Sequence, residues 1–256
     1  PSDMDEGSGA DLFVWGGNRN YTLGLSHGND SALPERVKLK CNERRTPLIA
    51  GARFNRPHVR DISMSRWHTV LATNEPRKNV YVCGIGSQAR LGRSAQSLPT
   101  FEPLRDFSDT ANTVVAGSDH TIIVTETGAV YTFGSNRMAQ LGYAIEEGLG
   151  VVSSSSGTKR SGATSHPNQH SLQGPVSDVS GVELDLQVTP RRVQGPLKRE
   201  VIIGAAASRL HSVAYTASAL YTWGTNNGQL GYDRHSAPVQ VQPRRVTVAV
   251  SYTHLR

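Results

Sequence analysis

The apolar positions of this chain fall into short runs that end at a glycine, and the same run occurs four times. In each copy apolar or aromatic residues lead to the glycine, and a Leu-Gly pair follows six or seven residues later. The first glycines of the four copies are Gly16, Gly84, Gly134 and Gly224. Short runs closed by glycine are typical of β-strands joined by tight turns. The pattern therefore predicts an all-β chain built from repeats.

A second block recurs between these runs, and each of its copies contains a histidine. His68, His120 and His211 are each followed by Thr or Ser and then by apolar residues. The first glycines of the four copies are 68, 50 and 90 residues apart, so the basic unit has about 50 residues, with insertions in the first and third copies. A repeat of this length made of short strands is typical of a β-propeller blade.

An asparagine follows the strand run in three of the copies, at Asn18, Asn136 and Asn226. Asparagine tolerates left-handed backbone and bonds readily to nearby backbone groups. Both properties suit the turns at these three positions.

The repeats divide the chain into segments. We expect a flexible segment at residues 1–11, repeats over 12–246, and a non-repeat tail at 247–256, for which sequencing read-through is one interpretation. The expected blades, about three and a half in number, lie near 12–79, 80–129, 130–219 and 220–246. An open set of blades leaves unpaired sheet edges. We therefore expect a fragment of a larger protein, poorly soluble or oligomeric by itself, that needs the remaining blades or a second copy to close the propeller.

The insertion at residues 146–188 is rich in Ser, Gly, Gln and Pro and has almost no aromatic residues, which predicts a disordered surface loop. Alternatively it is a regulated docking segment, because phosphorylation beside Lys159 and Arg160 would reverse the local charge. The candidate phosphorylation sites are Ser153, Ser154, Ser155 and Ser156.

The insertion at residues 38–58 is basic, and we expect either a solvated face or a contact with an acidic partner. Its basic residues are Lys38, Lys40, Arg44, Arg45, Arg53 and Arg56.

Composition excludes several classes of protein. The 256 residues include 27 Lys and Arg against 21 Asp and Glu, a net charge of +6 that mildly favours acidic partners. The two cysteines, Cys41 and Cys83, form no CxxC pair, which argues against a disulfide scaffold or a zinc finger. No apolar run reaches the roughly 18 residues that a membrane-spanning helix needs, so we expect no membrane association.

No catalytic motif is recognisable. The chain has no P-loop, GxSxG or HExxH motif, and Gly84-Ile85-Gly86 lacks the rest of a dinucleotide fingerprint. The three histidines occupy one equivalent position in different blades, too far apart to share a metal ion. We therefore expect structural histidines that bond within each blade, no metal, no cofactor and no enzymatic activity.

The two blocks resemble the regulator-of-chromosome-condensation repeat, a seven-bladed β-propeller family. The similarity covers residues 12–246 apart from the insertions. Two stretches, Asp119–Gly134 and Tyr221–Gly231, look most like the repeats of the inhibitor-of-Bruton-tyrosine-kinase type, in which ankyrin repeats precede the propeller and BTB domains follow it. The resemblance implies a partial seven-bladed propeller within a substrate adaptor for a cullin-RING ubiquitin ligase.

The resemblance also implies a binding face. In the founding member of the family, residues just before the repeat histidine face a small GTPase, and the matching positions here are Trp67, Asp119 and Leu210. Together with Arg66 and Arg209 they are expected to form a partner-binding surface, since Trp and Arg are enriched at protein interfaces. The alternative for Trp67 is packing between blades.

The predicted function is thus non-enzymatic protein binding inside the cell, in the cytoplasm or nucleus. The partner would be a ligase substrate. The alternative is guanine-nucleotide exchange on a Ran-type small GTPase or chromatin binding. We do not expect nucleic acid as the main partner, because the arginine pairs Arg191-Arg192 and Arg244-Arg245 recur at one point of the repeat and so belong to the blade pattern.

Overall fold

The regular structure of the chain is almost entirely β. The computed structural model describes residues 12–37, 39, 57–94, 96–145 and 185–247. Within these ranges the elements are strands, apart from two short 3-10 helices, η1 (Ser87–Ala89) and η2 (Gly195–Arg199). The all-β prediction is confirmed.

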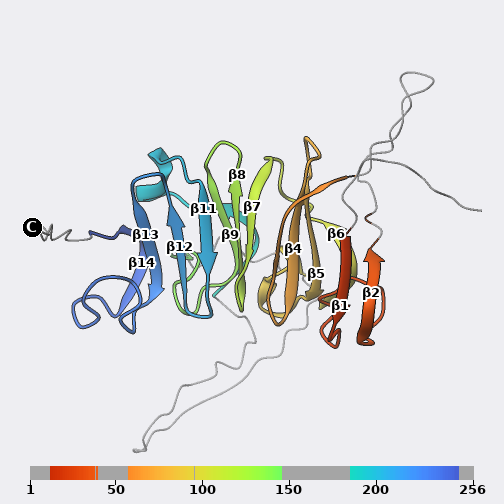
Figure 1. Cartoon of the computed structure of the whole chain (residues 1–256). Helices are drawn as coiled ribbons and strands as arrows, with labels where there is room; N and C mark the ends of the chain where they lie inside the picture. Colours follow the sequence, from red (N-terminus) through yellow and green to blue (C-terminus); the bar gives the residue numbers. More distant parts are fainter. Residues whose placement is uncertain (1–11, 38, 40–56, 95, 146–184, 248–256) are drawn as a thin grey trace, which may run out of the picture. The chain divides into compact units, whose positions relative to one another are not determined.

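The described strands form one two-stranded and three four-stranded sheets (Figure 1). The first sheet pairs β1 (Leu12–Gly16) with β2 (Ser31–Val37). The second contains β3 (Val59–Met64), β4 (His68–Thr73), β5 (Val80–Ile85) and β6 (Ser97–Pro103). The third contains β7 (Ala111–Ala116), β8 (His120–Thr125), β9 (Val130–Ser135) and β10 (Leu186–Arg192). The fourth contains β11 (Gly204–Ala207), β12 (His211–Tyr215), β13 (Leu220–Thr225) and β14 (Val239–Arg245). Neighbouring strands are antiparallel and follow chain order, as in propeller blades.

The boundaries of the sheets differ from the blade boundaries that the sequence repeats predicted. The expected unit 12–79 supplies β1 and β2 to one sheet and β3 and β4 to the next. The incomplete sheet is accordingly the first of those described, whereas the fourth has all its strands. The offset arises because the histidine block and the glycine-ended run that follows it form a hairpin, which places them in one sheet.

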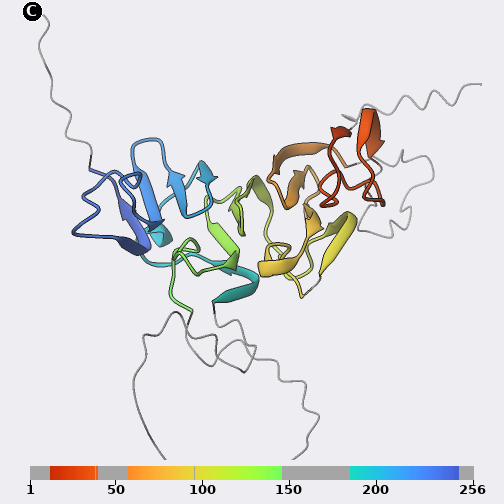
Figure 2. The ribbon, with the colours of Figure 1, turned by 90° about the horizontal axis from the view of Figure 1, so that it is seen from below.

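Apolar residues from facing sheets form the core. One cluster includes Val70 and Val82 from the second sheet with Val114 and Ile123 from the third. Strand β7 contacts β3 and β4 on one side and β11 on the other. In Figure 2 the sheets follow one another in the order of the chain. Each four-stranded sheet therefore buries its apolar side chains against its neighbours, as the repeat pattern requires.

A second such cluster joins the third and fourth sheets, with Ile122, Leu141 and Val193 packed against Tyr221 and the fully buried Trp223. Tyr221, Trp223 and Leu141 come from the glycine-ended runs and Leu-Gly pairs that define the repeat, and Ile122 comes from the histidine block. The apolar residues that identify the repeat in the sequence are thus the ones that hold neighbouring sheets together.

The last strand of each sheet carries proline, as Pro34, Pro103, Pro190 and Pro243 show. Proline has no backbone N–H to donate to a neighbouring strand, so it is tolerated at a sheet edge, where one side of the strand has no partner. The pairing register shifts in these outer ladders next to the repeat glycine, for example between Val82 and Gly84.

The three repeat asparagines bond to the local backbone, as expected. Asn18 Oδ1 accepts from the Leu23 N–H at 3.0 Å, and Asn136 Oδ1 accepts from the Leu141 N–H at 3.0 Å. No asparagine among the described residues has a positive φ, so these turns do not use its tolerance of left-handed backbone. The amide side chain spans the turn, and the left-handed residues are others, such as Tyr21 and Ala139.

Several predicted features lie outside the described residues. They are segment 1–11, most of insertion 38–58 with its six basic residues, insertion 146–184 with Ser153–Ser156, and tail 248–256. The second insertion ends earlier than expected, because Leu186 and Gln187 already pair with β9 as the start of β10.

Candidate functional site

The predicted binding residues lie on three equivalent two-residue turns. The turns join β3 to β4, β7 to β8 and β11 to β12, and each is closed by an N–H that donates to the histidine carbonyl. The bonds run from Ser65 to His68, Gly117 to His120 and Ser208 to His211, each 2.9 Å long. The residues at the turn tips are Arg66-Trp67, Ser118-Asp119 and Arg209-Leu210.

The repeat glycine fixes each turn through the backbone. The Ser135 N–H donates to the Asp119 carbonyl at 2.8 Å, and matching bonds reach the carbonyls of Trp67 and Leu210. Gly134 has a φ of +115°, and a Cβ built on it would lie 2.5 Å from the Asp119 oxygen. Only glycine fits such a conformation and such a close approach. The close approach explains the glycine in the second, third and fourth copies, whereas Gly16 shares only the positive φ.

The buried histidines connect one sheet to the next. His68 Nε2 lies 2.8 Å from Thr121 Oγ1, whose hydroxyl donates to the Arg90 carbonyl at 2.8 Å. The single hydroxyl hydrogen is thus used, so the imidazole must donate from Nε2. His120 Nε2 makes the same bond to Ser212 Oγ at 2.8 Å. The expected bonds within a sheet are also present, since Ser65 Oγ lies 3.1 Å from His68 Nδ1 and Ser208 Oγ lies 2.7 Å from His211 Nδ1. The sequence did not predict the bonds to the next sheet, whose partners lie 53 and 92 residues away along the chain.

Burial keeps these two imidazoles neutral. It lowers the pKa of His68 to about 3, aided by the nearby positive charge of Arg90, and it lowers the pKa of His120 to about 3. Their Nε2 atoms are occupied by the bonds between sheets. Among the described residues no group of three His, Cys, Asp or Glu side chains is placed to hold a metal ion.

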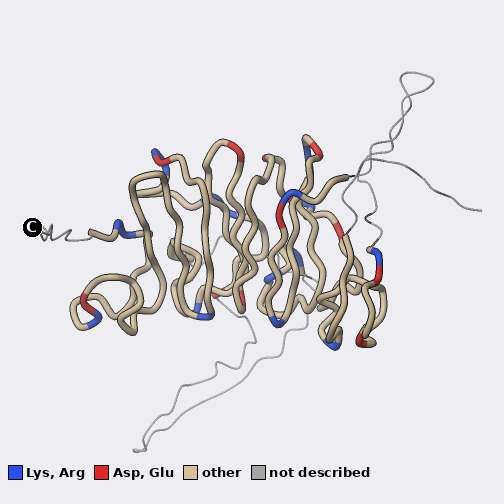
Figure 3. Tube along the Cα trace, viewed as in Figure 1, with Lys and Arg blue, Asp and Glu red and all other residues tan. Residues whose placement is uncertain are grey.

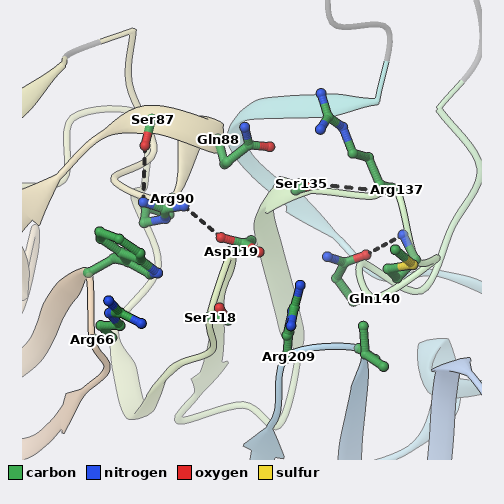
Figure 4. Close-up of a pocket in the computed structure, with 13 residues that line it drawn as sticks. Arg66, Ser87, Gln88, Arg90, Ser118, Asp119, Ser135, Arg137, Gln140 and Arg209 are labelled. Carbon is green, nitrogen blue, oxygen red and sulfur yellow. Dashed lines mark hydrogen bonds and ion pairs between the residues drawn. The ribbon is translucent and has the colours of Figure 1, made fainter. Parts of the chain in front are cut away.

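The turn tips surround one open hollow of about 600 Å³ (Figure 4). The loops that follow β5 and β9 complete its wall. All five predicted binding residues line it, together with residues that the sequence did not single out. The full lining is Arg66, Trp67, Ser87, Gln88, Arg90, Ser118, Asp119, Ser135, Arg137, Met138, Gln140, Arg209 and Leu210. The structure thus brings together residues from three sheets that the sequence separates by more than a hundred positions.

An ion pair lies in the middle of the hollow. Arg90 Nη2 contacts Asp119 Oδ1 at 2.6 Å, and the Arg90 side chain is only 4% exposed, whereas that of Asp119 is 31% exposed. Burial lowers the pKa of the Arg90 guanidinium, and the Asp119 charge opposes that effect. Arg66 stacks on the Trp67 ring at 4.9 Å and Arg90 lies 5.6 Å from it. The indole therefore lies close to two cations and is partly exposed.

Sequence reasoning missed Arg90, Arg137 and Met138. Arg90 immediately precedes the repeated Leu91-Gly92 pair, and Arg137 follows Asn136 in the equivalent loop of the next sheet. Both arginines lie in the loop after the third strand of a sheet, and this shared position in the repeat is a sequence signal. The signal points to the site only when that loop and the histidine turn are known to lie at the same end of the sheet. Among the described residues no helix is long and apolar enough to cross a membrane.

Comparison with known proteins finds the repeat family over part of the chain. The regulator of chromosome condensation (RCC1) repeat model matches residues 112–140. BTB/POZ domain-containing protein 1 of Schizosaccharomyces pombe is 33% identical over 95% of this chain. The human inhibitor of Bruton tyrosine kinase is 30% identical over 93% of it. The chain spans only 15% and 14% of these two relatives. A bovine secretion-regulating guanine nucleotide exchange factor is 27% identical over 93% of this chain and 40% of its own length.

Solved structures agree on the fold. Human WBSCR16 superimposes with a TM-score of 0.64 at 19% identity, over 93% of this chain and 50% of that one. Yeast RCC1 (Prp20), solved with Kap60, superimposes with a TM-score of 0.62 at 16% identity, over 92% of this chain and 45% of that one. The partial propeller predicted from the repeats is confirmed.

Proposed function

We infer that this RCC1-repeat protein is a non-enzymatic interaction module that binds a protein partner through the hollow at the turn tips. The observation that supports this function is the convergence of Arg66, Trp67, Asp119, Arg209 and Leu210 on one open surface. Four of the residues around it are arginines and one is a partly exposed tryptophan, the two residue types that most often dominate the binding energy of an interface. The module would act inside the cell, in the cytoplasm or nucleus.

The finer proposal concerns the whole protein of which these repeats are a part. Similarity to a BTB/POZ domain-containing protein and to the inhibitor of Bruton tyrosine kinase supports a BTB-containing substrate adaptor for a cullin-RING ubiquitin ligase. In such an adaptor the propeller would select the substrate. Phosphorylation of Ser153–Ser156, in the insertion between β9 and β10, would regulate docking.

Replacing Trp67 tests the binding face. We expect Trp67→Ala to weaken partner binding by about 2 kcal/mol or more, roughly 30-fold, because it removes the only aromatic side chain among the described lining residues. Proximity labelling in cells should identify proteins that the parent labels and the variant loses. Titration calorimetry with each purified candidate then gives the change in affinity.

Arg199→Ala is the matched control, since Arg199 is exposed on η2 at the other end of the fourth sheet. It should retain every partner of the parent. If Trp67→Ala keeps its partners but unfolds at lower denaturant concentration, Trp67 is a packing residue and the proposed face is wrong.

Guanine-nucleotide exchange is the second candidate, favoured by the similarity to the secretion-regulating exchange factor. Exchange would require tighter binding of the nucleotide-free GTPase, with Asp119 as an acidic contact. We expect no acceleration of nucleotide release from a Ran-type GTPase, measured with a fluorescent nucleotide. Acceleration that Asp119→Ala abolishes would instead establish the exchange function.

A further inference from the structure

The hollow carries an excess of positive charge. Arg66, Arg90, Arg137 and Arg209 line it, and Asp119 is the only carboxylate among its described lining residues. Figure 4 shows the side chains of Arg66, Arg90 and Arg209 arranged around Asp119. Figure 3 shows that charged residues lie mainly on the turns and loops rather than within the strands. The four arginines of the hollow likewise lie on turns and loops, at one end of the sheets.

The arginines differ in how far neighbouring groups already compensate their positive charge. Arg90 is bonded to Ser87 at 3.1 Å and paired with Asp119, so its charge is largely compensated. Arg66 and Arg209 are exposed, and no described Asp or Glu lies within ion-pair distance of either. The Arg66 guanidinium lies over the face of Trp67, and the Arg66 backbone carbonyl accepts from Asn20. These two cations, on turns from the second and fourth sheets, are available to a ligand.

Apolar groups lie between the available cations. Trp67 and Leu210 are half-buried and Met138 is 41% exposed, and all three line the same hollow. A ligand that paired only with the arginines would leave this apolar surface exposed to water. The combination fits a chain that carries carboxylates beside an apolar side chain.

The arrangement favours a protein segment over nucleic acid. A nucleic-acid strand presents evenly spaced phosphates and is bound by a groove of basic residues that follows the backbone. Here the cations converge on one hollow with the Asp119 carboxylate among them, which would repel a phosphate chain passing through its centre. A peptide can place its acidic residues at the two outer arginines and avoid Asp119.

We propose that the hollow binds an acidic segment of the protein partner, with its carboxylates on Arg66 and Arg209 and an apolar side chain against Trp67, Met138 and Leu210. This inference rests on the proposed function, because it specifies the partner chemistry of the same face. It assigns Arg66 and Arg209 the selection of charge and Trp67 the main apolar contact.

The test selects ligands from a random-peptide display library on the full-length protein. We expect the enriched peptides to contain more Asp and Glu than the input library, and the enrichment to disappear with the double variant Arg66→Glu/Arg209→Glu. An enriched peptide should bind the parent at least about tenfold more tightly than the double variant in fluorescence anisotropy, with affinity falling as salt rises. Arg199→Glu, which adds the same kind of charge reversal at the other end of the fourth sheet, should bind as the parent does.

Asp119→Asn gives a second, opposite expectation. Removing the central carboxylate leaves the Arg90 charge uncompensated, so the same peptide should bind about threefold more tightly. Asparagine keeps the shape of the side chain, and the backbone carbonyl of residue 119 can still accept from the Ser135 N–H. Circular dichroism melting should show that each variant remains folded.

Three results would overturn the proposal. They are a peptide pool with no acidic excess, including a pool with no enrichment at all; equal binding when the acidic residues of the peptide are changed to Asn and Gln; and a single-stranded DNA oligonucleotide that binds more tightly than the peptide. If any of these occurs while Trp67→Ala still loses its cellular partners, the proposed function stands and only the acidic chemistry fails. If Trp67→Ala loses no partner either, both fail.

Discussion

Acidification from about pH 7 to about pH 5 should lower the free energy of unfolding by about 4 kcal/mol through His68 and His120 alone. Burial lowers the pKa of each to about 3 in the folded protein, against 6.5 for an ordinary histidine. The unfolded chain therefore binds more protons between these values, and stability falls as pH drops below about 6.5. Each histidine contributes about 2 kcal/mol of this loss by pH 5.

Urea unfolding at several pH values measures the effect. The double variant His68→Gln/His120→Gln keeps an N–H that can reach the Thr121 and Ser212 hydroxyls but does not titrate, so its stability should fall with pH by about 4 kcal/mol less than that of the parent. His235→Gln, which removes an exposed imidazole from the loop before β14, serves as the control. Equal pH dependence in the parent and the double variant would show that the buried imidazoles do not govern acid unfolding.

Gly134→Ala should destabilise the protein by about 3 kcal/mol or more. The substitution forces a side chain into a conformation with φ of +115° and places its Cβ 2.5 Å from the Asp119 carbonyl and 2.6 Å from the His120 Cα. Both neighbours are backbone atoms of the turn and cannot rotate away. The turn must therefore open, which breaks the bond from the Ser135 N–H to Asp119.

Gly16 offers the matched control, because it has a similar φ of +105° but nothing lies within 4 Å of its would-be Cβ. Gly16→Ala pays only for the backbone conformation, about 1 to 2 kcal/mol. The difference in unfolding free energy between the two variants isolates the contact with the turn. If both cost the same, the close approach to the carbonyl has no part in holding the turn.

The repeat pattern predicted where the strands lie in the sequence, but it did not predict which strands come together in one sheet or pack between sheets. The glycine-ended runs became β1, β5, β9 and β13, because alternation and glycine are local properties of a strand and its turn. The sequence does not show which strand of one repeat meets which strand of the next. The offset between repeats and sheets, and the bonds from His68 and His120 to hydroxyls in the following sheet, depend on that neighbourhood.

The outer strands were the least predictable part of the fold. β6 and β10 contain proline and lack a clear apolar alternation, since each is the outermost strand of its sheet in the part of the chain that the structure describes. The candidate site shows the same division. Trp67, Asp119 and Leu210 could be located because they precede the repeat histidine, whereas Arg90 joins the site only through the folding of the loop after β5.

In the three turns that carry the tip residues, different groups maintain the turn conformation and contact the ligand. Each turn is fixed by main-chain atoms and a glycine, and its two tip positions hold Arg-Trp, Ser-Asp and Arg-Leu in the three sheets without changing the turn. Side chains at these positions can therefore vary with little cost to the scaffold, Asp119 being the exception because it compensates Arg90. The end of the sheets that carries the hollow is in this sense a display platform, on which new recognition properties can evolve or be engineered by exchanging a few tip residues.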